Sequence, residues 1–203
     1  MEKLEDGDCW YSHKNDNNEA LSLLYSRHVH ELFSYGMRIC GDNQLVKDSI
    51  QEVFIHLIDK KRKLVLTEIS SAYLFKSLRN KLFEEYRTKS NRSNNIKHIT
   101  SDEIMFDESM EQITIKSEEE LSRRRILEAA LGSLSNYQRE AIFLKYSQGF
   151  SYEKIAEVLD IDIASARTLV YRSLKKVKDT ILPTTTSKTL TTKSLILYIS
   201  LLK

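Results

Sequence analysis

Residues 151–178, SYEKIAEVLDIDIASARTLVYRSLKKVK, predict two helices joined by a short turn. Ser151 is a residue type that favours a helix N-cap, and the first helix is expected from there to Leu159. Asp160-Ile161-Asp162 is expected to form the turn, and the second helix is expected over 163–181. Two helices joined by so short a turn are a helix-turn-helix candidate.

The second of these helices is expected to have one apolar and one polar half. At 100° per residue, the half expected in the core holds Ile163, Ala166, Leu169, Val170, Ser173, Leu174 and Val177. The opposite half holds Arg172 and Lys175 among short polar residues and Tyr171, with Arg167 and Lys178 at one edge and Lys176 at the other. Residues 167–178 hold five Lys or Arg residues and no acidic one. A helix that enters the major groove needs cations toward phosphates and polar or Arg side chains toward base edges.

The residues expected to contact bases are Ser165, Arg167, Thr168, Tyr171 and Arg172, and those expected to contact the DNA backbone are Lys175, Lys176 and Lys178. For this helix taken alone, a solvated charged face is the alternative interpretation. The preceding helix favours the DNA interpretation, because Ile155, Ala156 and Leu159 provide the small apolar contact that two closely crossing helices require.

The composition predicts a helical protein without catalytic or metal chemistry. The 203 residues include one Pro and 5 Gly, too few for a sheet with many turns or for glycine-rich phosphate loops. Cys9 and His13 stand four apart but lack a second ligand pair, so no metal and no cofactor are expected. The five histidines are scattered with no nucleophile or carboxylate pair nearby, so no catalytic residue, enzymatic activity or small-molecule substrate is expected.

The cysteine count and the N-terminal sequence predict a cytoplasmic location. Two cysteines build no disulfide framework, which is typical of a reducing compartment. The start, MEKLEDGD, lacks the apolar run of a secretory signal. Near the other end, LILYISLL (195–202) is too short to cross a bilayer as a helix.

Charge and periodicity divide the chain into two small helical domains joined by an acidic flexible linker, an all-α fold. Residues 91–122 hold 3 basic and 8 acidic residues, whereas 123–203 hold 14 basic and 7 acidic residues. The C-terminal part is therefore the expected polyanion binder. The expected division is a flexible arm (1–18), a first helical domain (19–90), the linker (91–122), a helix-turn-helix domain (123–182) and a tail (183–203).

Apolar spacing predicts the helices within these domains. The first domain is expected to contain helices over 21–39, 44–59 and 71–89, with a basic loop over 60–70. The second is expected to begin with helices over 123–133 and 136–148.

Two faces of the first domain are candidate binding surfaces. On the helix over 44–59, Asp48, Gln51 and Glu52 lie near Ile55 and opposite the apolar side, a pattern typical of a docking surface for a basic protein or of a solvated face. On the helix over 71–89, basic residues alternate with aromatic ones, which suits single-stranded nucleic acid. Core packing of half or more of these aromatic residues is the alternative.

Three runs together resemble one family. DSIQEVFIHLI (48–58) and SAYLFKSLRNKLFEEYR (71–87) precede a long run, LGSLSNYQREAIFLKYSQGF (131–150), which continues into the helix pair. In this order they resemble the two domains of extracytoplasmic-function sigma factors of the sigma-70 family, especially those of the Bacteroides type. The resemblance covers most of 20–90 and 123–180.

The resemblance implies roles for individual residues. It implies that core RNA polymerase is bound through Asp48, Gln51, Glu52 and Phe54. It implies that melted promoter DNA at the minus-ten element is contacted by Tyr73, Lys76, Arg79 and Asn80. The helix matching 165–176 would read the minus-thirty-five element as duplex. Leu169 stands where many members carry Arg, so the family's base preferences are not transferred.

The expected function is therefore that of a promoter-specificity subunit, which recruits polymerase and assists promoter melting. The implied partners are core RNA polymerase, promoter DNA and a membrane-anchored anti-sigma factor, and the acidic linker would lie in the RNA-exit path of the polymerase. A helix-turn-helix regulator that binds duplex DNA without being a polymerase subunit is the alternative, and a helical adaptor that binds no nucleic acid is a third possibility.

Overall fold

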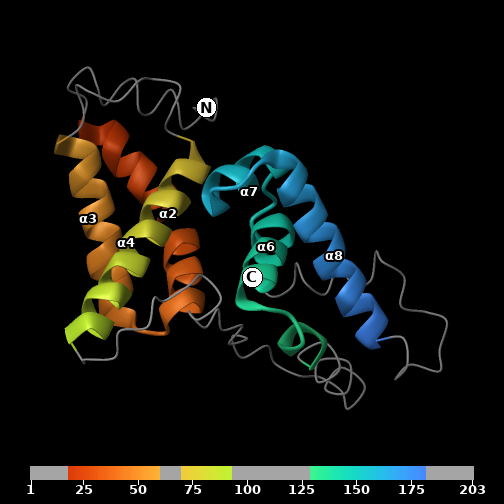
Figure 1. Cartoon of the computed structure of the whole chain (residues 1–203). Coiled ribbons are helices and arrows are strands. Elements are labelled where there is room, and N and C mark those ends of the chain that lie inside the picture. The colour runs from red at the N-terminus through yellow and green to blue at the C-terminus, as the bar shows by residue number, and fades with distance from the viewer. Residues whose placement is uncertain (1–17, 60–69, 93–128, 182–203) are drawn as a thin grey trace, which may run out of the picture. The chain divides into compact units, whose positions relative to one another are not determined.

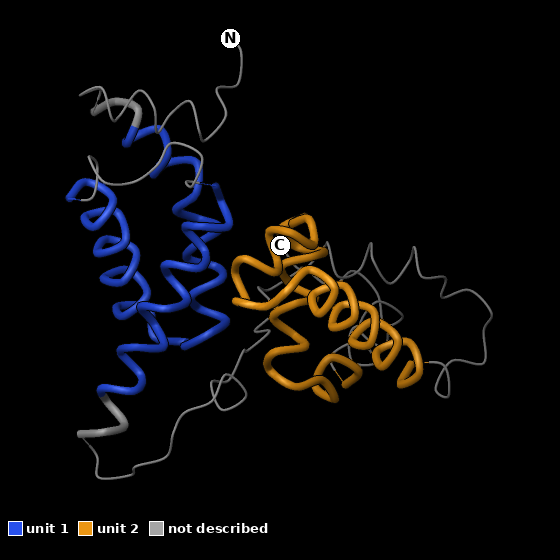
Figure 2. The backbone as a smooth tube through the Cα atoms, turned by 45° about the horizontal axis from the view of Figure 1, so that its top comes forward, with its two compact units in different colours: residues 1–99 blue, residues 100–203 orange. Residues whose placement is uncertain are grey.

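The computed structural model describes residues 18–59, 70–92 and 129–181, and within these ranges every regular element is helical. The chain divides into two compact units, residues 1–99 and 100–203 (Figure 2). The predicted all-α fold of two helical units is thereby confirmed. The expected N-terminal arm before Asn18, most of the basic loop, the linker beyond Arg92, the tail, Cys9 and His13 lie outside the described residues.

The first unit contains three described helices, α2 (Asn18–Cys40), α3 (Asn43–Asp59) and α4 (Ser71–Arg92), and each packs against the other two (Figure 1). The helix boundaries follow the sequence signals. Gly41 adopts a φ of +65°, which ends α2. Asp42 then starts α3, because its Oδ1 accepts a hydrogen bond from the Leu45 N–H at 3.1 Å.

The core of this unit is formed by one stripe from each helix, as the spacing predicts. Tyr35 of α2 and Phe75 of α4 meet at its centre, with ring centroids 5.0 Å apart. The other buried apolar residues of the three helices are Leu24, Leu32, Ile39, Val46, Ile50, Val53, Phe54, Leu57, Ala72, Leu74, Leu78 and Leu82. α4 continues two residues into the span expected for the linker.

The second unit contains α6 (Asn136–Ile142), η1 (Phe143–Ser147), α7 (Tyr152–Leu159) and α8 (Ile163–Ile181). Of the helix expected over 123–133, residues 129–132 are described and are helical. α8, the longest helix among the described residues of this unit, packs against both α6 and α7 (Figure 1).

The helix expected over 136–148 changes its winding at Phe143. From there to Ser147 it is a π-helix, and the Gln148 N–H donates to the Phe143 carbonyl, five residues back, at 3.1 Å. Gly149 follows with a φ of +67° and ends it, as its residue type predicts. The apolar spacing did not distinguish the π turn from an α turn, because both bury the same residue types.

The turn between α7 and α8 is set by side-chain caps. Ser151 caps α7, because its hydroxyl accepts from the Lys154 N–H at 3.3 Å. Asp160 ends α7 in the left-handed region at a φ of 57°, which Asp tolerates better than most residues. Asp162 caps α8, because its Oδ1 accepts from the Ser165 N–H at 2.8 Å. The predicted helix-turn-helix is confirmed.

One face of α8 is buried. Ala166, Val170, Ser173 and Val177 are buried, and the Ser173 hydroxyl is satisfied by donating to the Leu169 carbonyl at 2.7 Å. The expectation that Ile163 lies in the core is wrong: this residue is 44% exposed. It is the first residue of α8, where the apolar stripe has reached its end.

No helix within 18–59, 70–92 and 129–181 is both long enough and apolar enough to span a bilayer.

The close approach of α2 and α3 at Gly36 provides a test of the fold. A Cβ added to Gly36 would lie 2.7 Å from Cγ1 of Val46, a stiff β-branched side chain in a helix. We expect Gly36→Ala to lower the free energy of unfolding by about 1 kcal/mol, because overpacking costs more than Ala gains in helix propensity. Chemical denaturation measures this change.

The matched background is Val46→Ala, which removes the methyl groups in question. In that background Gly36→Ala is expected to be neutral or stabilising. An equal loss of stability in both backgrounds would show that Val46 is not the cause.

Candidate functional site

The face of α8 opposite its buried stripe is the basic surface that the sequence predicts. The residues expected to contact DNA are all exposed: Ser165, Arg167, Thr168, Tyr171, Arg172, Lys175, Lys176 and Lys178. Tyr171 is 68% exposed, an unusual position for a large ring. We call these residues the α8 surface. It combines cations with one aromatic and two hydroxyl side chains.

The first turn of α8 is held by Asp162. Its carboxylate accepts from both the backbone N–H and the hydroxyl of Ser165, at 2.8 and 2.6 Å. These hydrogen bonds lower the pKa of Asp162, so the carboxylate is charged at neutral pH. The Ser165 hydroxyl is thereby fixed in direction, with its lone pairs available as acceptors.

Arg167 is restrained by α7. Its guanidinium lies 3.8 Å from Oε1 of Glu153 and 5.4 Å from the ring centre of Tyr152. Lys145 lies 4.5 Å from the centre of the same ring and donates to the Phe150 carbonyl at 3.0 Å. Glu153 and Tyr152 were not among the residues expected near Arg167. Their place in the first turn of α7 is the signal that could have found them.

Glu153 is an acidic residue beside this basic surface. Its pKa is lowered first by hydrogen bonds from its own backbone N–H and from the Ser151 hydroxyl, and further by the charge of Arg167. It therefore stays charged.

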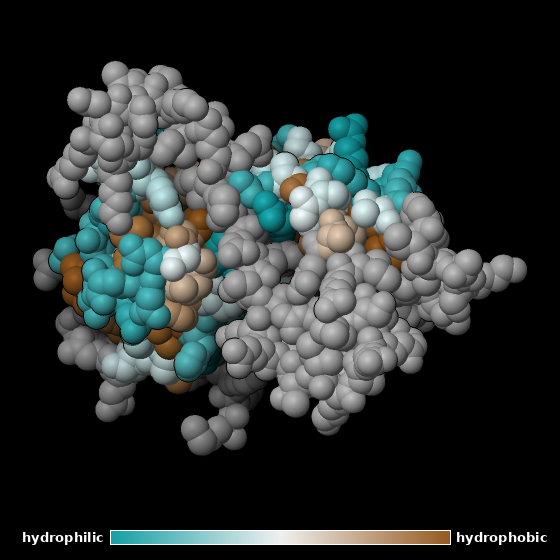
Figure 3. Space-filling model, turned by 90° about the horizontal axis from the view of Figure 1, so that it is seen from below, coloured by the Kyte–Doolittle hydropathy of each residue, from teal (hydrophilic) through white to brown (hydrophobic). Residues whose placement is uncertain are grey.

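The exposed side of α3 is the second candidate surface. Asp48, Gln51 and Glu52 are exposed as expected, and Ile55 beside them is 52% exposed. We call these four residues the α3 face. Within α3, Asp48 Oδ1 accepts from the Gln44 side-chain amide at 2.9 Å. On the side of the first unit that Figure 3 displays, polar surface (teal) likewise borders apolar surface (brown).

The assignment of Phe54 to this surface is corrected by the structure. Phe54 is 6% exposed, and its ring packs edge-on against Tyr25 of α2, with centroids 5.0 Å apart. Its side chain belongs to the core of the first unit, and a role of Phe54 in docking stays a prediction. Ile55 and Ile58, 52% and 47% exposed, are the large apolar residues that α3 leaves at the surface.

The residues of α4 expected to contact melted DNA differ in exposure. Asn80 is exposed and Tyr73 and Lys76 are half-buried, so these three remain accessible. Arg79 is 8% exposed, and its guanidinium lies 4.4 Å from the ring centre of Phe83, one turn later on α4. The Arg79 side chain is thus largely buried within the unit, and its contact with melted DNA stays a prediction.

The aromatic residues of α4 are less buried than the core interpretation predicts. Phe75 is fully buried, whereas Tyr73, Phe83 and Tyr86 are half-buried. The Tyr86 hydroxyl donates to the Cys40 carbonyl at 3.0 Å, and partial burial raises the pKa of this phenol.

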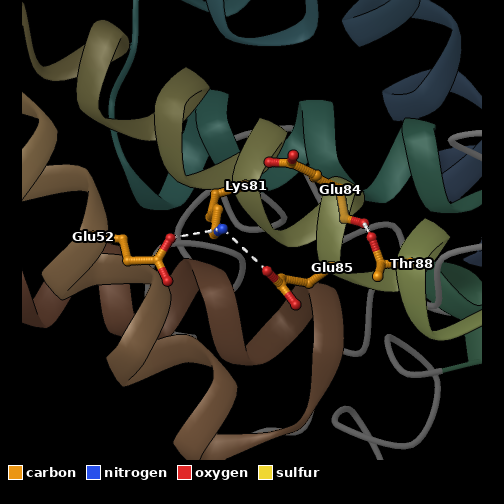
Figure 4. A network of polar contacts seen from close by, with 5 residues as sticks. All are labelled: Glu52, Lys81, Glu84, Glu85 and Thr88. Carbon is orange, nitrogen blue, oxygen red and sulfur yellow. Dashed lines mark hydrogen bonds and ion pairs between the residues drawn. The ribbon is translucent and has the colours of Figure 1, made fainter.

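Lys81 of α4 connects two carboxylates. Its Nζ lies 2.6 Å from Oε2 of Glu52 on α3 and 3.0 Å from Oε1 of Glu85 on α4 (Figure 4). Hydrogen bonds to Glu52 and then Glu85 raise the pKa of Lys81. Glu52, a member of the α3 face, is thus tied to α4. Among the described residues, no group of His, Cys, Asp and Glu could hold a metal ion.

Comparison with known proteins relates both units to one family. The profile of sigma-70 region 2 matches residues 24–92, and that of sigma-70 region 4 matches residues 124–177. Together they cover more than half of the chain. The chain is 25% identical over 155 residues to RNA polymerase sigma factor SigZ of Bacillus subtilis, which covers 76% of this chain and 83% of SigZ.

Two solved structures share the fold. CnrH, solved in complex with the cytosolic domain of CnrY, superposes with a TM-score of 0.58 at 20% identity, covering 86% of this chain and 95% of CnrH. The sigma factor RpoE from Bartonella quintana, solved with the anti-sigma factor NepR, superposes with a TM-score of 0.57 at 19% identity, covering 79% and 95%.

Regions 2 and 4 therefore occur in one chain, in that order, and each coincides with one helical unit that exposes a distinct charged surface. The chain belongs to the sigma-70 family of RNA polymerase sigma factors, in its extracytoplasmic-function group, and is a transcription initiation factor.

Proposed function

We propose that the α3 face binds core RNA polymerase, that α4 contacts the melted minus-ten element and that the α8 surface reads the minus-thirty-five element as duplex. In this role the chain is not an enzyme, because the polymerase performs all catalysis. The observation that carries the proposal is the α8 surface, which places five cations between residues 167 and 178 opposite a buried stripe.

The chemistry of the α8 surface suits the major groove. Arg167 and Arg172 offer planar donor pairs that match the acceptors of guanine, and Thr168 offers a hydroxyl and a methyl group. Lys175, Lys176 and Lys178 follow toward the C-terminal end, where the helix leaves the base edges and meets phosphates. The restraint of Arg167 by Glu153 reduces the conformational entropy lost on binding.

The accessible residues of α4 suit a single strand. Tyr73 offers a ring on which an unpaired base stacks, and Lys76 lies one turn later with a cation for phosphate. Asn80, a further turn along, offers an amide that donates and accepts hydrogen bonds. Arg79 supports this surface from within, through its contact with Phe83.

The α3 face suits a basic protein surface with an apolar centre. Asp48 and Glu52 provide charge, Gln51 provides an amide, and Ile55 provides apolar area that loses water on docking. This combination supports polymerase as the partner.

The proposal extends to a cytoplasmic location and to control by a membrane-anchored anti-sigma factor. CnrH and RpoE, which share the fold, were solved with the cytosolic domain of CnrY and with the anti-sigma factor NepR. A partner of this kind would cover the α3 face or the α8 surface. The proposed domains are 19–90 and 123–182, with 91–122 as a linker in the RNA-exit path, and the two compact units support this division.

Asp48→Arg tests the polymerase interface. Asp48 is exposed, so the reversal of its charge is expected to leave the unit folded and to abolish the complex with core polymerase through like-charge repulsion. Fluorescence anisotropy of labelled chain titrated with core polymerase measures binding. Glu84→Arg, which makes the same charge change at an exposed position of α4, is the control and is expected to bind. A persistent complex with Asp48→Arg would exclude the α3 face as the interface.

Arg172→Ala tests DNA recognition. We expect the binding free energy for the preferred duplex to weaken by about 1–3 kcal/mol, because a bidentate base contact is lost. For the same reason, we expect weaker discrimination between bases at one base pair. Lys175→Ala is the comparison. Because Lys175 is expected to contact phosphate, its loss should weaken binding to all DNA sequences equally and reduce the dependence of DNA affinity on salt. Selection of duplexes from a random pool by polymerase loaded with each variant measures both effects. Unchanged affinity and specificity in Arg172→Ala would contradict the assigned surface.

A further inference from the structure

The ammonium of Lys81 joins the two helices to which different partners are assigned above. α3 contributes Glu52 and α4 contributes Glu85, and Figure 4 shows both carboxylates directed at the Lys81 Nζ from opposite sides. Lys81 directly follows Asn80, which belongs to the surface proposed for melted DNA. The same turn of α4 therefore carries a DNA-facing residue and a contact to the α3 face.

The Lys81 end of this ion pair is less exposed than the Glu52 end, with side chains 24% and 50% exposed. At the Lys81 end, water therefore screens the interaction less than at the surface. The 2.6 Å separation from Glu52 is short even for a charge-assisted hydrogen bond, which is about 2.7–2.9 Å between ammonium and carboxylate. Two carboxylates bind the Lys81 ammonium, and together they fix its position.

The Glu52 carboxylate is therefore held in place by one of its two oxygens. Oε2 is bound by Lys81, whereas Oε1 makes no hydrogen bond or ion pair with any described residue. A glutamate side chain on a helix surface otherwise samples several rotamers and loses this freedom when it binds a partner. Lys81 removes that loss in advance, which is preorganisation of the binding group.

We propose that Lys81 is a positioning residue for polymerase docking, which holds the Glu52 carboxylate so that Oε1 accepts from a basic group of the polymerase. The inference rests on the proposed function of the α3 face. It adds a residue that lies on a different helix from the docking surface and acts only through Glu52.

A double-mutant cycle tests the inference. In the full chain, Lys81→Met is expected to weaken binding to core polymerase about fivefold, the upper range for a pair at the surface. In a Glu52→Gln background, Lys81→Met is expected to have no further effect, because the carboxylate that it positions is absent. Lys81→Arg retains a donor that reaches Glu52 and is expected to bind within about twofold of the unmodified chain.

Controls separate positioning from charge and from stability. Arg87→Met removes the same charge from an exposed position of α4 and is expected to bind as the unmodified chain does. Glu85→Gln keeps the contact between Lys81 and Glu52 and is likewise expected to bind. Thermal unfolding of each variant shows whether the protein is folded at the assay temperature, and binding is compared below the lowest unfolding transition.

Each outcome bears on one claim. Equal affinity of Lys81→Met and the unmodified chain would overturn the inference and leave the proposed function intact. An effect of Lys81→Met that persists in the Glu52→Gln background would also overturn it, because Lys81 would then act by another route. Failure of the unmodified chain to bind polymerase would overturn the proposed function and the inference with it.

Discussion

The burial of one face of α8 is the constraint on which the DNA-binding unit depends. Val170, Ser173 and Val177 pack against the preceding helices, and because a helix is rigid, this contact also fixes the direction of the opposite face. The basic side chains between Arg167 and Lys178 therefore emerge together on one side. The caps at Ser151 and Asp162 also help to fix this direction, because they determine where α7 and α8 begin.

In the first unit, burial of one helix face fixes the direction of the opposite face in each of the three described helices. α2, α3 and α4 each bury one stripe in a shared core, which leaves the outer side of α3 and part of α4 exposed. The absence of a side chain at Gly36 lets α3 approach α2 closely at Val46. Lys81 joins α3 to α4 at the surface, so that the two candidate binding faces of this unit share one ion-pair network (Figure 4).

Helix positions and buried stripes were predictable because both follow from residues near one another in the sequence. α8 begins and ends where the apolar spacing and the Asp160–Asp162 turn predict. Depth of burial was less predictable, because it depends on neighbouring residues as well as on direction. Phe54 is covered by Tyr25 from another helix, and Arg79 is drawn against Phe83. The pairing of Lys81 with α3 likewise depends on tertiary packing, which helical periodicity does not encode.

In the proposed function, two helical units of one chain direct polymerase to promoters through two separate DNA elements. Transcription reconstituted from core polymerase, the purified chain and a pool of genomic promoter fragments tests it most directly. We expect a stable complex that initiates on a subset of fragments, which share two short motifs at a constant spacing. Salt-sensitive binding of the chain to duplex DNA, with no polymerase complex and no initiation, would contradict it.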